Sequence, residues 1–148
     1  MTDIMIYESG NGGELSLKNG DIESTDAIFN QPYLSHFGGN IEALTTGNEI
    51  EGVERFDWFG NSFLESGAQV NSLLEKSLNE NALNSSGRIV IESDANTDLE
   101  FLKDLGTIQS EVSITGVDKV RISDKINQSK VDFIWNATKD ELIEEITI

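Results

Sequence analysis

The hydrophobic pattern changes its period near Gly106, and this change constrains the fold more than any other feature of the sequence. From Thr107 onward, apolar residues alternate with polar ones over 108–114, 120–126 and 131–135, and turn residues separate the three stretches. Alternation with a period of two is typical of a strand with one buried face, so we expect an antiparallel meander. A sheet of this kind needs helices over its apolar face, which predicts an α+β fold.

Two amphipathic helices are predicted before this change. The first spans 67–78: Ser66 and Gln69 have the spacing of a capping box, and an apolar stripe follows at Val70, Leu73, Leu74 and Leu78. The second spans about 86–105, with Gly106 as its C-terminal glycine and a stripe at Ile91, Ala95, Leu99, Leu102 and Leu105. Residues 88–92 alone favour a strand, but the longer pattern favours the helix.

In the N-terminal part, the sequence predicts short antiparallel strands over residues 3–24. Asn19-Gly20 is a strong hairpin signal, because both central positions of a type I′ turn need positive φ. Pro32 is expected to begin a short helix that ends at Gly38-Gly39. Residues 41–52 read as a surface loop, and residues 140–148 as either a last turn or a strand. With no repeat or composition shift, we expect one domain over 1–148.

The 148 residues carry a net charge of −17, which favours basic partners and argues against binding to nucleic acid or to an anionic membrane surface. There is no cysteine, so disulfides and thiolate metal sites are excluded. No apolar run approaches the roughly 20 residues that span a bilayer, and the N-terminus lacks the features of a signal peptide. We therefore expect a soluble protein made in a cytoplasm.

Two motifs could carry chemistry. Asp94-x-Asn96-x-Asp98 begins like an EF-hand loop, but Leu99 replaces its glycine and Leu105 its glutamate, so the three polar residues read as the polar face of a helix. His36 is the single histidine. It could act as a general base, but no nucleophile motif accompanies it. A satisfied or surface histidine is the expected outcome.

Paired carboxylates and tryptophans carry little information here. The acidic pairs among Glu49, Glu51 and Glu54 and at Glu144-Glu145 are expected by chance in a chain with 27 acidic residues. Trp58 and Trp135 could stack on sugars, but large aromatic residues are usually core. The sequence therefore predicts no enzyme, no catalytic residues, no cofactor and no metal.

The order of the segments resembles a known family. An N-terminal "GGELSL.NGDI" hairpin precedes a short helix and "GVERFDWFGNSF", and these are followed by "NSLLEKSL", "DLEFLKDLG" and "VSITGVDKVRIS". This arrangement, over about residues 3–126, is similar to the baseplate wedge family of contractile tails typified by phage Mu. That family is related to the small wedge protein of other contractile phages and of type VI secretion baseplates. The acidic segment 41–51 and the tail after Gln128 depart from the family pattern.

The resemblance implies a structural subunit without catalysis. It would be a virion component of the tail baseplate, assembled in the host cytoplasm, in a hetero-oligomer with other baseplate wedge, hub and sheath proteins. Its helices would bundle with those of larger wedge proteins and link the hub to the sheath. Because interfaces are enriched in tryptophan, phenylalanine and arginine, the residues expected to meet partners are Arg55, Trp58, Phe59, Phe63 and Leu73. The same residues could instead be buried in the protein's own hydrophobic core.

The acidic composition supports an alternative function, a DNA mimic that inhibits a nucleic-acid-binding enzyme. A mimic needs carboxylates along one face at about the phosphate spacing. Here lysines interrupt the acids at 103, 119, 125, 130 and 139. A hydrolase acting through its acidic pairs ranks third.

Overall fold

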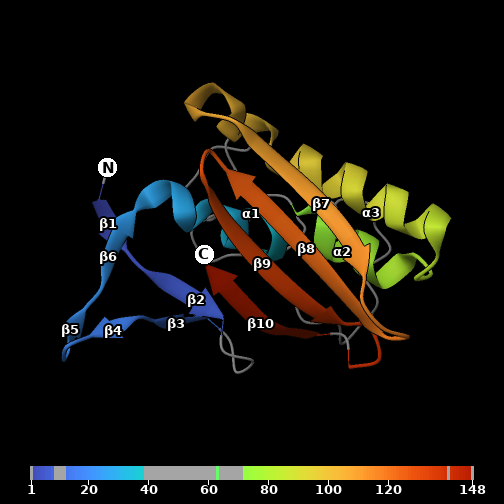
Figure 1. Ribbon diagram of the computed structural model, residues 1–148, viewed down its shortest axis with the longest axis horizontal. Helices are drawn as coiled ribbons and strands as arrows, with labels where there is room; N and C mark the ends of the chain where they lie inside the picture. Colours follow the sequence, from blue (N-terminus) through green and yellow to red (C-terminus); the bar gives the residue numbers. More distant parts are fainter. Residues whose placement is uncertain (1, 9–12, 39–62, 64–71, 140, 148) are drawn as a thin grey trace.

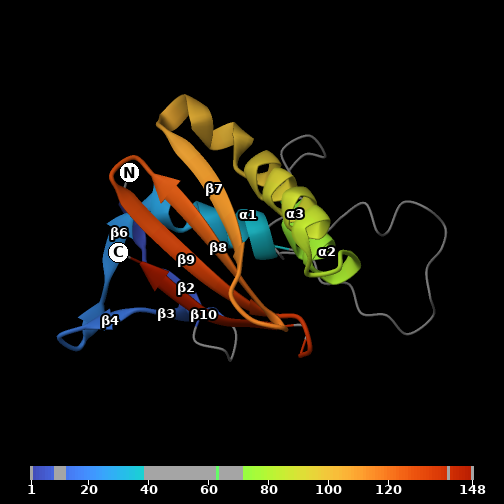
Figure 2. The same cartoon turned by 45° about the vertical axis from the view of Figure 1, so that its right-hand side comes forward.

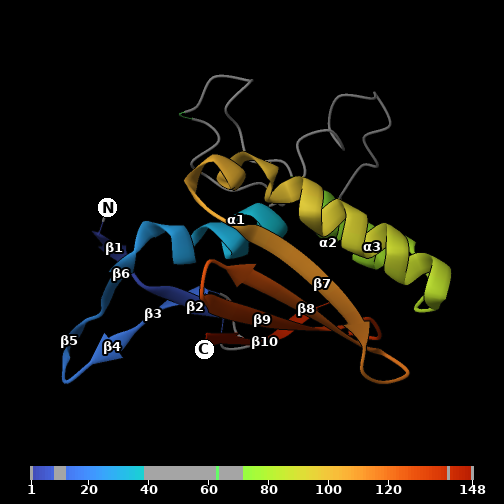
Figure 3. The ribbon, with the colours of Figure 1, turned by 45° about the horizontal axis from the view of Figure 1, so that its top comes forward.

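A computed structural model describes residues 2–8, 13–38, 63, 72–139 and 141–147. The protein has an α+β fold, as predicted: helices cover one face of a four-stranded antiparallel sheet of order β10-β9-β8-β7 (Figure 1). The layers are clearest in Figure 3, where the helices lie above the sheet. Within the described parts of the chain, no helix is long and apolar enough to cross a bilayer.

The sheet follows the predicted meander. Its strands are β7 (Ile108–Ile114), β8 (Lys119–Ile126), β9 (Ser129–Asn136) and β10 (Glu141–Thr147). Of the two alternatives expected for residues 140–148, a turn or a strand, β10 shows that the strand forms. Asn127 turns the chain between β8 and β9 with φ 54°, which asparagine tolerates better than most residues.

The helices are η1 (Ala27–Phe29), α1 (Gln31–Phe37), α2 (Leu73–Glu80), α3 (Ser85–Asp98) and η4 (Glu100–Leu105). Figure 2 shows α1, α2 and α3 together on one side of the sheet. Pro32 lies in the first turn of α1, where its missing N–H costs no hydrogen bond. The helices and the sheet share one core, which contains Leu74, Leu78, Ile91, Ala95, Leu99, Leu102, Ile108, Val112, Val120, Ile122, Ile126, Val131, Phe133 and Trp135.

The predicted start of the first main helix is wrong. Helix α2 begins at Leu73, and its N-cap is Ser72, whose backbone is extended and whose hydroxyl accepts a hydrogen bond from the Glu75 N–H. Ser66 and Gln69 lie outside the described residues. Serine is a favourable N-cap residue at either position, so the local sequence does not distinguish Ser66 from Ser72. Tertiary contacts of Ser72, described below, favour the later start.

The second main helix is confirmed, with a different ending. Its regular part stops at Asp98, and the tighter η4 continues to Leu105, which is exposed and not part of the buried stripe. Gly106 is extended, with φ 165°, so it is not the left-handed cap that we expected. A Cβ added at position 106 would overlap the side-chain amide of Asn127, whose oxygen accepts a hydrogen bond from the Thr107 N–H.

Residues 2–8 and 13–26 form a thin arm at the side of the body (Figure 1). Its strands are β1 (Thr2–Ile4), β2 (Ile6–Glu8), β3 (Gly13–Leu15), β4 (Leu17–Lys18), β5 (Asp21–Ile22) and β6 (Ser24–Asp26). They pair as β1-β6, β2-β3 and β4-β5. The predicted Asn19-Gly20 turn is confirmed, since both residues have positive φ, 56° and 83°.

Gly87 allows α3 to approach the loop that precedes it. A Cβ at this position would overlap the carbonyl oxygen of Ala82, which is backbone and cannot rotate away. Alanine in place of a helical glycine normally stabilises by about 0.5–1 kcal/mol. We expect Gly87→Ala to lower the free energy of unfolding by about 1–3 kcal/mol instead, because overlap forces the helix to shift. Urea denaturation, with the exposed neighbour variant Ser86→Ala as control, measures this; a gain in stability would contradict the packing.

Candidate functional site

His36 lies fully buried between two aspartates that come from distant parts of the chain. It extends from α1; its Nε2 is 2.9 Å from Oδ2 of Asp124 on β8, and its Nδ1 is 3.4 Å from Oδ2 of Asp98 at the end of α3. The ring of Phe133 meets the imidazole edge-on, with centroids 6.0 Å apart. The single histidine thus links the helical layer to the sheet.

Further hydrogen bonds fix both carboxyl groups. The backbone N–H groups of Leu73 and Leu74 donate to Asp98 at 2.9 Å each, so this side chain also satisfies the first turn of α2. A negative charge at a helix N-terminus is favourable. On the sheet side, the Ser110 hydroxyl donates to Oδ1 of Asp124 at 2.6 Å. Every partner of the two carboxyl groups is a donor, as ionised carboxylates require.

Ser72 connects the same cluster to α1. Its hydroxyl donates to the backbone carbonyl of His36, and its oxygen also accepts from the Glu75 N–H. Ser72 is fully buried. Helix α2 therefore begins at Leu73 because its N-cap is held against α1, while its first N–H groups are held by Asp98.

The electrostatics favour a doubly protonated His36. Burial, the largest effect, lowers the pKa of His36, but the charge and hydrogen bond of Asp124 and the hydrogen bond and charge of Asp98 together raise it to about 9. Both ring nitrogens face a carboxylate oxygen, and a carboxylate can only accept. An imidazolium with two N–H donors satisfies both contacts.

This arrangement does not suit general-base catalysis. A base needs a free lone pair within reach of a substrate proton, and here both ring nitrogens donate to carboxylates in the interior. Among the described residues, no group of three or more His, Asp or Glu side chains is arranged to hold a metal ion. The cluster joins α1, α2, α3, β7 and β8, and its chemistry is that of a structural ion pair.

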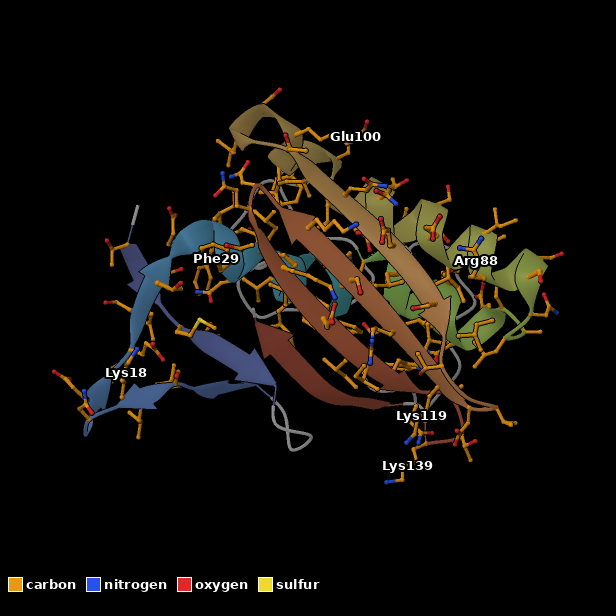
Figure 4. The ribbon with its side chains drawn as sticks, in the orientation of Figure 1. Lys18, Phe29, Arg88, Glu100, Lys119 and Lys139 are labelled. Carbon is orange, nitrogen blue, oxygen red and sulfur yellow. The ribbon has the colours of Figure 1, made fainter. Side chains whose placement is uncertain are left out.

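A second polar arrangement covers the outer edge of the sheet. The Asn96 amide donates to the Ser110 carbonyl at 2.9 Å and accepts from the Ser110 N–H at 3.0 Å. One turn earlier, Glu92 accepts from the Val112 N–H at 2.9 Å, and Arg88 donates to the Val112 carbonyl at 3.3 Å. Figure 4 shows Arg88 on α3, the helix beside β7. Side chains four apart on α3 thus occupy the place of a fifth strand.

Free strand edges invite pairing with other chains, and this edge is protected. We expect Asn96→Ala to lower the free energy of unfolding by about 1–3 kcal/mol, because it leaves both backbone groups of Ser110 unpaired on the part-buried edge. Self-association should increase as well. Urea denaturation and sedimentation velocity test both effects against the exposed Ser93→Ala on the same helix. Equal stability of the two variants would contradict the pairing.

Only two of the five predicted interface residues, Phe63 and Leu73, lie in the part of the chain that the structure describes. Arg55, Trp58 and Phe59 lie outside the described residues. Phe63 is largely exposed, and Leu73 is half-buried at the start of α2. Their proposed role in partner binding stays a prediction.

The residues of the failed EF-hand pattern have other roles. Asp94, Asn96 and Asp98 lie on α3, as expected from the helical reading. The sequence did not show that Asn96 pairs with β7 or that Asp98 is buried against His36. The one available signal was the four-residue spacing of Arg88, Glu92 and Asn96, which places them on one helix face.

Comparison with known proteins gives no relative. No protein-family model, curated protein or solved structure matches this chain.

Proposed function

We propose that this protein is a structural component of the baseplate wedge of a contractile phage or phage-like tail. In this proposal it links hub and sheath through helix bundling with larger wedge proteins. The observation that carries it is the ordered series of sequence segments over about residues 3–126, from the N-terminal hairpin to "VSITGVDKVRIS". No cofactor takes part, and assembly takes place in the host cytoplasm.

The polar cluster around His36 supports a structural role. Both of its ring nitrogens are engaged by carboxylates, and the surrounding side chains hold helices to strands. Buried polar groups fix a single packing arrangement in some proteins, while a buried ion pair adds little net stability compared with an apolar replacement. A subunit that transmits force between neighbours benefits from one fixed arrangement of its layers.

The outer surface of α3 and η4 supports helix bundling. Several large apolar side chains are exposed there, although α3 already has a buried stripe on its inner face. Packing against a helix of another protein would remove this apolar area from water. The exposed residues are Ile89, Val90, Phe101 and Leu105.

Sedimentation of a lysate of the source tests the proposal, with the protein followed by mass spectrometry. We expect it to sediment with tail-sized particles at a fixed ratio to sheath and tube proteins. If it stays in the soluble fraction, the tail assignment is wrong. Co-purification with one basic enzyme, in a complex that high salt dissociates, would favour the acidic DNA-mimic function instead.

Variants of the helix surface refine the test. Ile89→Lys should reduce incorporation into particles at least tenfold, because a lysine would be desolvated in the bundle. Val117→Lys is the matched control, since Val117 is 99% exposed in the turn between β7 and β8. Trp58→Ala tests the interface predicted from sequence. Equal incorporation of Ile89→Lys and the control would exclude this face of α3.

A further inference from the structure

The three strand pairs of the N-terminal arm meet at a closed ring of backbone hydrogen bonds. The Met5 N–H donates to the Glu23 carbonyl at 2.9 Å, the Glu23 N–H to Ser16 at 2.8 Å, and the Ser16 N–H to Met5 at 3.0 Å. From this ring the three ladders β1-β6, β2-β3 and β4-β5 diverge. The Ser16 hydroxyl also donates to the Glu23 carboxylate at 2.7 Å, which further braces the centre.

The residues next to the ring share one face. Successive side chains of a strand alternate between faces, so each neighbour of a ring residue points opposite to it. Cross-strand partners lie on the same face, and the register pairs Ile6 with Leu15 and Leu17 with Ile22. Ile4 pairs with Ser24. Five of the six flanking positions are therefore aliphatic: Ile4, Ile6, Leu15, Leu17 and Ile22.

Four of the five aliphatic side chains of this face are exposed, and Ile6 is partly buried. Leu17 is 69% exposed and Leu15 52%, and Ile4 and Ile22 are exposed to nearly the same extent. Scattered exposed apolar residues are common, but a group that shares one face of a projecting ribbon is typical of an interaction surface. The arm buries little of its own apolar area, so its sequence is not explained by the stability of the arm alone.

Asn30 holds the arm in a fixed position. Its Oδ1 accepts from the Ile6 N–H at 3.2 Å, and its Nδ2 donates to the Ile4 carbonyl at 2.6 Å. Asn30 is buried at the start of α1. The aliphatic face is therefore presented by a braced element, and docking does not require the arm to be ordered first.

The negative charge of the arm favours a positively charged partner. Residues 2–26 contain six acidic residues and one basic residue, Lys18, which lies near the outer end of the arm (Figure 4). Lys18 forms an ion pair with Glu23 at 3.3 Å. Two copies of a chain with net charge −17 repel each other, whereas a positively charged partner is attracted.

We propose that the aliphatic face of the arm docks onto a basic protein that presents an apolar patch bordered by lysine or arginine. The inference goes beyond the wedge assignment and does not depend on it, because the contacts and charges of the arm carry it. The apolar contact supplies the affinity, and the net negative charge of the arm and of the chain supplies long-range attraction that speeds association.

Site-specific photo-crosslinking in cells of the source tests this docking. A photoreactive amino acid replaces Leu17 in the full-length protein, and Val117, an exposed residue in a turn of the body, is the control position. We expect position 17 to give a crosslink to a protein of net positive charge, with no such product from position 117. No product above the control overturns the inference, and so does a crosslink to a second copy or to an acidic protein. A basic partner outside the tail keeps this inference and removes the wedge assignment.

Binding of the purified crosslinked partner then measures the contribution of the face. Leu17→Thr/Ile22→Thr keeps the net charge and the strand propensity while it removes apolar area. We expect at least tenfold weaker binding than for Val117→Thr, and a further loss of affinity at high salt for all variants. Equal affinity of the two variants would show that the aliphatic face is not the docking surface.

Discussion

Replacement of Asp124 by alanine is expected to lower the free energy of unfolding by about 3–5 kcal/mol, the largest effect of any substitution considered. Asp124 is the nearer of the two carboxylates to His36, at 2.9 Å, and also accepts from the Ser110 hydroxyl. Its removal leaves a buried imidazolium with one partner and a buried hydroxyl with none. Removal of one member of a buried pair is costly because the other charge is left buried without its partner.

Urea denaturation at pH 7 measures the loss. The matched control is Asp104→Ala, which removes an exposed carboxylate on η4 and should change stability by less than about 0.5 kcal/mol. A loss below about 1 kcal/mol for Asp124→Ala would mean that the cluster does not hold the layers together.

The second large effect is a pH dependence of stability that originates from His36. Its pKa is raised to about 9 in the folded protein, above the value near 6.5 of an unperturbed histidine. The folded chain therefore binds this proton more tightly than the unfolded chain. The resulting stabilisation is fully present below pH 6.5 and is lost as the pH rises through 9, and amounts to about 3 kcal/mol.

Comparison with His36→Gln isolates this contribution from that of other titrating groups. The difference in unfolding free energy between the two proteins should decrease steadily from pH 6.5 to 9.5. Denaturation curves in urea at half-unit steps give this difference. A constant difference over that range would show that His36 is neutral in the folded protein.

Local periodicity was sufficient to predict the layers of this fold. Alternation predicted β7, β8 and β9, and the stripe through Ile91, Ala95 and Leu99 correctly outweighed the strand signal at 88–92. The Asn19-Gly20 turn was predictable because positive φ has few sequence solutions. Each of these signals is contained within one segment of the chain.

The polar clusters could not be predicted, because their partners are far apart in sequence. His36 is 62 residues from Asp98 and 88 from Asp124. Nothing near His36 indicates which of the 27 acidic residues would meet it. For the same reason, the sequence does not indicate Ser72 as the N-cap of α2, because its hydroxyl contacts the backbone carbonyl of the distant His36.

The interior polar groups hold the layers of the fold together, and the exposed apolar groups are the proposed contacts with partners. The His36 cluster joins three helices to the sheet, and Arg88, Glu92 and Asn96 close the β7 edge. Apolar side chains remain exposed on α3 and on the arm. A subunit of a larger assembly, as proposed, needs both features.

Titration of the imidazole by nuclear magnetic resonance shows whether His36 is charged inside the folded protein. The chain has one histidine, so its ring signals need no further assignment. We expect the nitrogen and carbon shifts of a doubly protonated ring from pH 6 to 8, with half-titration near 9. A ring that is neutral at pH 8 and titrates near 6.5 would contradict the buried ion pair and the structural role assigned to it.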